Sequence, residues 1–491
     1  MRTLLCTGLL CAGLTLAPCA LATKPDLPVG TDHPLVPFGG VPSDLTLDPG
    51  FTGDGSQVVD FNDAFSNTDT PDRVFKASDG GYWLAGIHGT GINEPPRVAI
   101  AKLRADGTLD TSYRGTGKHT APSGMDMVYD VAKGIGDTLY FAGSYTHPVA
   151  GDIDFGILCL DADGDRCEGF GANGFQSVPF DLGTGTEHVN DVPARIISAY
   201  SALYVAGSCG SGSGSNYNDA ICITKLSATS GTIDSGFATN GRYHRNFDMG
   251  GNLRDTITDI VAYSPSPGAV RLAITGDVKR GGPTDIDGFV ATVDGISGQA
   301  VPFGPGHVFI SVDLGTSKED HMTRLLRRAN GGFVVAGYAI DDTQTPVQAQ
   351  MVLVAYRADG SPDTGFGPGG MVHRLVMSGT NKPFGLVERP GNRDLVVGLN
   401  MRADLFGDSH PIVGLLQVGA NGGPQHAAAV LDFPGSSAPV ESIGNDLIHT
   451  DGAIVSAGSR KWSGLDLDMT ISRHIATDSL FADRFGGPAG D

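Results

Sequence analysis

Short apolar runs separated by turn residues recur along the whole chain. The first set has runs at 73–77, 82–86 and 98–103, with turns at Asp79-Gly80-Gly81 and Ala105-Asp106-Gly107. Asp-Gly between apolar runs favours a hairpin, because both residues tolerate positive φ angles. The runs are rich in β-branched and aromatic residues, which favours strands. Helical periodicity is not sustained over ten residues anywhere. The pattern therefore predicts an all-β protein.

The second run of each set ends in a glycine, and this element occurs seven times at intervals of about sixty residues. A fixed period of this kind indicates one supersecondary unit repeated, with neighbouring units burying each other's apolar faces. The seven glycines are Gly86, Gly143, Gly207, Gly276, Gly337, Gly398 and Gly458.

The last unit stops early, and the piece that it lacks occurs near the start of the repeat region. In other units a fourth segment follows the third run, as at the segments that begin at Leu109 and Ile233. Residues 47–61 match these fourth segments, whereas little regular pattern follows residues 469–473. A chain that begins with the fragment its end lacks is suited to close on itself. We predict a seven-bladed β-propeller of four-stranded blades, closed by the N-terminal strand.

The N-terminal residues resemble an export signal. Arg2 precedes an apolar run that ends in Ala20-Leu21-Ala22, the small-x-small pattern of a cleavage site. We expect a signal peptide at 1–22, a linker at 23–44, the repeat domain at 45–476 and a tail at 477–491. No other apolar run approaches the roughly 20 residues that span a bilayer. The expected product is an exported protein, extracellular or periplasmic, without an integral membrane span.

Charge and composition exclude some partners. The formal net charge is −21, which is unfavourable for nucleic acid because phosphate binding needs clustered Lys and Arg. A solvated acidic surface or a preference for cations would both explain the excess. The 72 glycines fit many tight turns. We expect a monomer that binds an unknown protein or glycan and no nucleic acid.

Four cysteines remain after the expected cleavage: Cys159, Cys167, Cys209 and Cys222. An even number in an exported protein indicates disulfides, and four cysteines allow three connectivities. Cys159 and Cys167 flank a turn, and Cys209 and Cys222 flank a loop within one hairpin. Local pairing is thus geometrically the easiest of the three.

The order of these motifs resembles the bacterial delta-60 repeat family. The closest matches are Phe333-Val334-Val335-Ala336-Gly337 and Pro362-Asp363-Thr364-Gly365-Phe366-Gly367. The resemblance extends from about Leu45 to Arg473. It implies an exported β-propeller-like repeat protein, and it supplies no reaction, substrate or catalytic residue.

Two groups of aspartates are candidates for calcium, the candidate cofactor. Asp161, Asp163 and Asp165 alternate as calcium ligands do, but Gly164 precedes the third acid, and the segment aligns with ordinary turns such as Ala105-Asp106-Gly107. A plain hairpin turn is the favoured interpretation. The second group falls near the start of the first strand in five units. Arg324 and Gly385 occupy the approximately equivalent positions in the other two units. Its members are Asp72, Asp130, Asp191, Asp259 and Asp446.

If the first strand is innermost, these five carboxylates crowd the rim of a narrow channel, where repulsion raises their pKa values or recruits a cation. The alternative is that each one caps its own strand through the backbone, and this alternative is favoured. Four further aspartates precede the third strand and are expected to cap turns. They are Asp154, Asp219, Asp287 and Asp468.

Two functions follow from different classes of protein. The favoured one is a binding or interaction scaffold that uses variable loops between its second and third strands. The alternative is a propeller-type lyase or lactonase-like enzyme with a site at one mouth of the channel. The sequence holds no hydrolase or metalloprotease motif, so catalytic residues stay unassigned.

Overall fold

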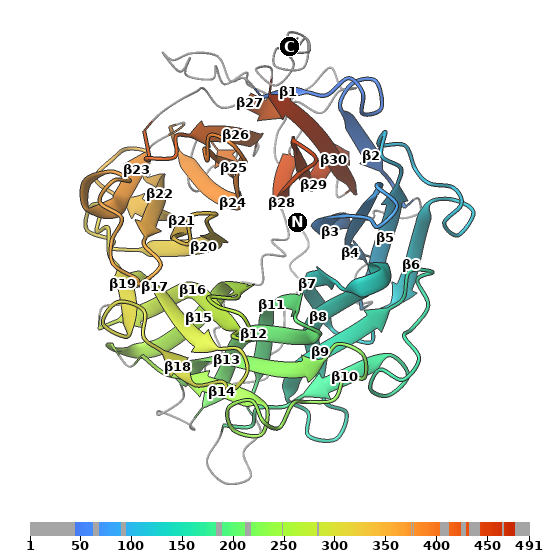
Figure 1. Ribbon diagram of the computed structural model, residues 1–491, viewed down its shortest axis with the longest axis horizontal. Coiled ribbons are helices and arrows are strands. Elements are labelled where there is room, and N and C mark those ends of the chain that lie inside the picture. Colours follow the sequence, from blue (N-terminus) through green and yellow to red (C-terminus); the bar gives the residue numbers. More distant parts are fainter. Residues whose placement is uncertain are drawn as a thin grey trace, which may run out of the picture.

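The computed structural model describes residues 45–61, 68–89, 95–182, 189–211, 218–247, 249–281, 284–374, 376, 378–402, 412–423, 429–431, 442–463 and 466–476. These residues form an all-β structure whose strands surround a central opening (Figure 1). The predicted signal peptide, linker and tail lie outside the described residues.

Seven units follow one another along the chain, each built from antiparallel neighbours. The first three units comprise β3 (Thr68–Lys76), β4 (Tyr82–Gly89), β5 (Arg97–Leu103) and β6 (Lys118–Pro122); β7 (Met127–Lys133), β8 (Leu139–Thr146), β9 (Ile153–Leu160) and β10 (Phe175–Val178); and β11 (Asp191–Ala199), β12 (Ala202–Ser211), β13 (Asn218–Ser227) and β14 (Arg242–Arg245). The 3₁₀ turn η1 (Ile135–Asp137) lies between β7 and β8.

The later units repeat this order. They comprise β15 (Gly250–Tyr263), β16 (Arg271–Arg280), β17 (Ile286–Asp294), β18 (Ala300–Val301) and β19 (His307–Ile310); β20 (Asp320–Arg327), β21 (Phe333–Asp341), β22 (Gln348–Tyr356), η3 (Pro368–Gly370) and β23 (Met371–Arg374); β24 (Thr380–Glu388), β25 (Leu395–Arg402), β26 (Ile412–Val418) and β27 (Ala429–Leu431); and β28 (Ser442–Thr450), β29 (Ala453–Ser463) and β30 (Asp466–Ala476).

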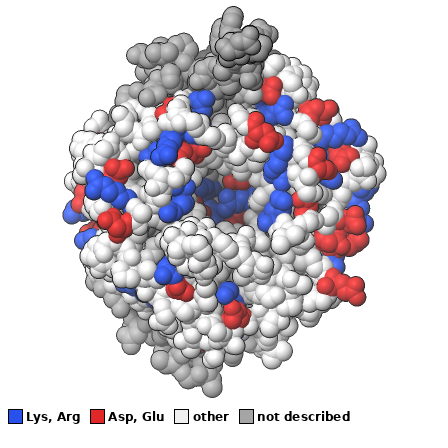
Figure 2. Space-filling view, viewed as in Figure 1, with Lys and Arg blue, Asp and Glu red and all other residues white. Residues whose placement is uncertain are grey.

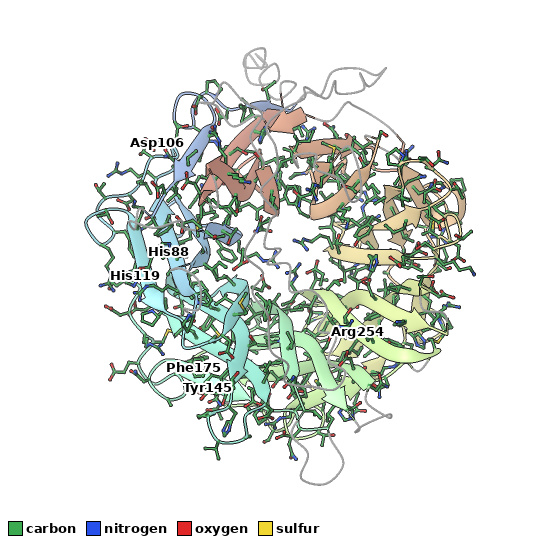
Figure 3. All side chains as sticks on the ribbon, turned by 180° about the vertical axis from the view of Figure 1, so that it is seen from behind. His88, Asp106, His119, Tyr145, Phe175 and Arg254 are labelled. Atoms are coloured by element: carbon green, nitrogen blue, oxygen red, sulfur yellow. A yellow bond between two sulfur atoms is a disulfide. The ribbon has the colours of Figure 1, made fainter. Side chains whose placement is uncertain are left out.

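The turn chemistry predicted from Asp-Gly pairs is present at the hairpins. Asp106 Oδ1 accepts hydrogen bonds from the amide and the hydroxyl of Thr108, and Gly107 has a φ of +85°. Asp106 lies at the outer edge of its unit (Figure 3). Side-chain bonds of this kind and a residue that tolerates positive φ make the chain reverse within two residues.

The first described strands join the last one. β1 (Leu45–Leu47) and β2 (Ser56–Val59) both pair antiparallel with β30. Phe51, between them, is fully buried and packs edge-on against Tyr82 of β4. The two ends of the described chain therefore share one sheet and one apolar cluster.

The sheets do not match the predicted fold. The described strands form four sheets of 9, 4, 9 and 8 strands. Parallel bridges between the third strand of one unit and the first strand of the next merge neighbouring units, as at Thr68 with Leu467, Asp219 with Arg254 and Ala349 with Thr380. The prediction of a seven-bladed β-propeller of four-stranded blades, closed by the N-terminal strand, is therefore wrong. The fold is all-β and propeller-like.

The core lies between the units. One cluster joins Tyr140 and Phe155 of the second unit to Leu203 and Val205 of the third, and equivalent clusters lie at the other junctions. The second and third strands read as continuous apolar runs because both of their faces are covered. This packing holds the first strands of all units around the centre.

Candidate functional site in the central cavity

Every first strand carries a β-bulge at the same point. Seven register shifts against the second strand occur between Pro71 and Arg73, Val128 and Asp130, Pro193 and Arg195, Ile257 and Asp259, Met322 and Arg324, Pro383 and Gly385, and Gly444 and Asp446. A bulge leaves one residue unpaired and turns the next side chain to a new direction. Neighbouring first strands contact one another, so the residues after the bulges lie near the same centre.

The residues after the bulges alternate in charge, and we call them the bulge set. In chain order they are Arg73, Asp130, Arg195, Asp259, Arg324, Gly385 and Asp446. Seven is an odd number, so strict alternation cannot be completed around the centre. Glycine takes the position where the alternation fails, between Arg324 and Asp446.

Arg73 connects carboxylates from two other units. Its Nε donates to Asp130 Oδ1 at 2.6 Å, and its Nη1 donates to Asp446 Oδ1 at 3.1 Å. The remaining oxygens accept backbone amides, Asp130 Oδ2 from Ile196 at 2.9 Å and Asp446 Oδ2 from Val74 at 3.0 Å. Each of these carboxylates thus joins first strands of different units instead of capping its own strand.

Asp259 repeats this arrangement. Its Oδ2 accepts the amide of Leu325 at 2.7 Å, and Arg195 Nε lies 3.5 Å from its Oδ1. Burial by itself would raise the pKa of Asp130, but the charges of Arg73 and Arg195 outweigh burial and hold that pKa below its ordinary value. The three carboxylates of the bulge set are therefore matched by arginines and backbone amides.

Arg324 differs from the other two arginines. Its Nη1 donates to the carbonyl of Thr323 at 2.8 Å and its Nη2 to that of Asn445 at 3.0 Å, while its buried Nε, like that of Arg195, has no hydrogen-bond partner. Within the described part of the chain, no carboxylate forms an ion pair with it. Burial, followed by repulsion from Arg195, lowers the pKa of Arg324 to about 9. Asp259 and Asp446 line the same cavity and partly offset these effects, but neither is ion-paired with Arg324 in the described part of the chain.

The bulge set borders a cavity of about 350 Å³. Arg73, Asp259, Arg324, Gly385 and Asp446 line the cavity together with apolar side chains such as Val74 and Leu386. Figure 2 shows Lys and Arg side chains gathered around this hollow at the centre of the face, with Asp and Glu beside them. The view from behind shows side chains pointing into the same opening (Figure 3).

The structure brings three of the five predicted rim aspartates together. Asp130, Asp259 and Asp446 belong to the bulge set. Asp72 is the bulged residue itself, and burial, followed by repulsion from Asp130, raises its pKa to about 8. Asp191 lies at the start of β11 and accepts the amide of Phe180 at 2.7 Å. Cation binding by these five residues stays a prediction.

The sequence-based prediction missed Arg73 and Arg195, because it compared the units at their acidic residues and not at the residue that follows each bulge. A signal was present: the residue after each bulge precedes Val, Ile or Leu, as in Arg73-Val74 and Arg195-Ile196. Aligning the units on this pair of residues, instead of on the first acidic residue, would have placed both arginines beside Asp130 and Asp259.

Asp161, Asp163 and Asp165 form a hairpin turn in the structure. Asp161 Oδ1 accepts the amides of Asp163 and Asp165, and Asp165 is paired with Arg114 at 2.6 Å on the surface. In the described part of the chain, the groups of three acidic side chains close enough to share an ion lie elsewhere. Calcium binding at this turn stays a prediction.

Both disulfides are local. Cys159 is bonded to Cys167 and Cys209 to Cys222, with Cα–Cα distances of 5.4 and 5.9 Å. This is the pairing that the sequence favoured on geometry. The first disulfide closes the turn after β9, and the second joins β12 to β13.

One family model agrees with a propeller-like fold. A family described as "Domain of unknown function (DUF5122) beta-propeller" matches residues 84–113, which is a short part of the chain. No curated protein matches. Within the described residues, no helix is both long and apolar enough to cross a membrane.

Solved structures also match this chain, and two examples are each 10% identical to it. One is a protein of unknown function from Dyadobacter fermentans, with a TM-score of 0.41. The match covers 86% of this chain and 98% of that chain. The other is Trypanosoma rangeli sialidase in complex with the inhibitor DANA, with a TM-score of 0.38. The match covers 75% of this chain and 58% of that chain. Similarity this low carries no argument about function.

Proposed function

We propose that the protein is an exported binding scaffold, and that its central cavity accepts a ligand bearing a carboxylate or a similar oxyanion. The observation that carries this proposal is Arg324, a cavity-lining guanidinium with an unpartnered Nε and no paired carboxylate. Guanidinium groups bind carboxylates through two parallel hydrogen bonds. A ligand oxyanion would supply the negative charge that Gly385 does not.

The cavity is suited to one small group. Its volume of about 350 Å³ lies at the lower end of the range of small-molecule sites, which begins near 300 Å³. Apolar side chains such as Phe75 and Leu386 line it beside the charges. This combination supports binding of a single charged residue of a glycan, with the rest of the ligand outside.

Binding is favoured over a lyase or lactonase reaction. A general base needs an accessible carboxylate or imidazole within reach of the substrate. The carboxylates of Asp130 and Asp446 are instead held by Arg73 and by backbone amides. Two disulfides also support export.

The test is calorimetric titration of the full chain with glucuronate, succinate and acetate, with glucose as the uncharged control. We expect glucuronate to bind more tightly than glucose, and Arg324→Gln to weaken that binding at least about tenfold, the loss of one charged hydrogen-bonded contact. Arg327→Gln is the matched control, because Arg327 lies on the same strand but stacks on Tyr263 and Phe333.

Failure of all three carboxylates to bind, or unchanged binding by Arg324→Gln, would overturn the proposal. Incubation with glucuronate-containing oligosaccharides, followed by NMR, tests the enzyme alternative. New products that depend on the protein would favour a lyase over a scaffold.

A further inference from the structure

A second group of acidic residues lies away from the cavity, where the fourth unit meets the fifth. A parallel bridge joins Ile286 to Glu319, and the amide of Ile286 donates to the carbonyl of Lys318 at 3.0 Å. This bridge places Asp287 of β17 beside Asp320 of β20. Asp313, which follows β19, completes the group, and one carboxylate oxygen of each aspartate lies within 4.8 Å of the other two.

One carboxylate oxygen of Asp320, a member of this group, has no hydrogen-bond partner. Asp320 is fully buried, and its Oδ2 accepts the amides of Val312 and Asp313 at 2.5 and 3.2 Å. Its Oδ1 is buried and has no hydrogen-bond partner. A buried acceptor without a partner is uncommon and costs free energy unless an ion or water satisfies it.

The charge of the group is also unbalanced. Arg280 is ion-paired with Asp287, and it is the one cation paired with these three carboxylates in the described part of the chain. Three negative charges and one positive charge leave a net charge of −2. Burial, with repulsion from Asp287 and Asp313, raises the pKa of Asp320 to about 6. A divalent cation would remove this repulsion.

We propose that Asp287, Asp313 and Asp320 bind one divalent cation, with calcium preferred. Calcium takes six to eight oxygen ligands at flexible geometry, so carbonyls and waters would complete the shell. Asp313 is exposed and leaves one side open to solvent, and the Ser311 hydroxyl donates to its Oδ2 at 3.0 Å. The ion would hold together the third strand of one unit and the first strand of the next.

A related group in the same molecule shows what such a site looks like when side chains satisfy it. Asp69 lies near Asp60 and Asp468, but His88 Nδ1 is 2.5 Å from Asp69 Oδ1, and the amide of Phe61 donates to Oδ2 at 3.1 Å. Both oxygens of Asp69 therefore have partners. Asp320 has no such histidine, and the cation would take that role.

The experiment uses the full chain, freed of metal by EDTA and then titrated calorimetrically with CaCl₂ and MgCl₂. We expect calcium to bind and to raise Tm. Asp313→Asn should weaken binding at least about tenfold, because it removes an exposed ligand charge and leaves the backbone bonds of Asp320 intact. Asp320→Asn is the second variant. Asp359→Asn, in an exposed hairpin turn, is the matched control and should bind as the wild type does.

Two outcomes would overturn the proposal. One is that calcium, magnesium and manganese all leave Tm unchanged and give no heat of binding in the calorimetric titration. The other is wild-type calcium affinity in both Asp313→Asn and Asp320→Asn. Loss of the response in Asp130→Asn alone would place the ion in the central cavity instead.

Discussion

Gly385 lies so close to Leu447 that a β-carbon at residue 385 would be 2.4 Å from the β-carbon of Leu447. This contact explains why the alternating charges end beside Arg324. Any side chain at residue 385 would push β24 away from β28, so an aspartate there cannot complete the series. The absence of a carboxylate beside Arg324 therefore follows from the close packing of Gly385 against Leu447.

The first prediction concerns this contact. Gly385→Ala should lower the free energy of unfolding by about 1–3 kcal/mol, the usual cost of overpacking a close contact. Urea denaturation measures the change. Gly365→Ala is the control, because only the side chain of Asp363 lies near a β-carbon at that position. Equal stability of the two variants would contradict the proposed close packing.

The second prediction concerns Arg73. Arg73→Met should lower the free energy of unfolding by about 3–5 kcal/mol, because it removes the guanidinium that is ion-paired with the buried carboxylates of Asp130 and Asp446. Arg114→Met is the matched control on the surface, where Arg114 pairs with an exposed Asp165. That change should cost no more than about 1 kcal/mol. A small loss for Arg73→Met would show that backbone amides are enough for both carboxylates.

The third prediction concerns pH. Burial raises the pKa of Asp191 from 3.8 to about 8, so the folded protein binds this proton more tightly than the unfolded chain does. The resulting stability is complete below about pH 4 and is lost as pH rises toward 8. Asp191→Asn keeps an acceptor for the amide of Phe180 and removes the titration. Its Tm should therefore fall less than that of the wild type between pH 5 and 8. Parallel curves would show that Asp191 has an ordinary pKa.

The fourth prediction concerns the first described strands. Deleting residues 45–61 removes β1 and β2, so one edge of β30 is left without its hydrogen-bond partners. Exposed edges favour aggregation. We expect a lower Tm and a rise in light scattering. Phe51→Ala is the milder variant, with an expected cost of about 3–5 kcal/mol for a buried aromatic ring. A truncated protein that melts and scatters like the intact one would contradict the role of these strands.

Local patterns predicted local structure well. The apolar run that ends at Gly86 became the buried strand β4, and Asp106-Gly107 became a hairpin turn. The strand and the turn each depend on residues that are close together in the sequence. The sheet count was wrong, because bridges such as Thr68 with Leu467 depend on residues almost 400 positions apart. The third-strand aspartates were also expected in turns, but Asp154 and Asp287 lie inside strands and are buried.

The sequence by itself determined that the chain is all-β, where its repeats lie and which cysteines are near enough to pair, because each of these follows from periodicity and short-range spacing. Only the tertiary structure decided which charges meet. Arg73 reaches Asp130 and Asp446 because a bulge turns its side chain toward the centre, and Arg324 has no carboxylate because β24 and β28 leave no room at Gly385. The bulge lies within one unit and has a sequence signal, but the ion pairs and the contact at Gly385 join different units and depend on how those units pack.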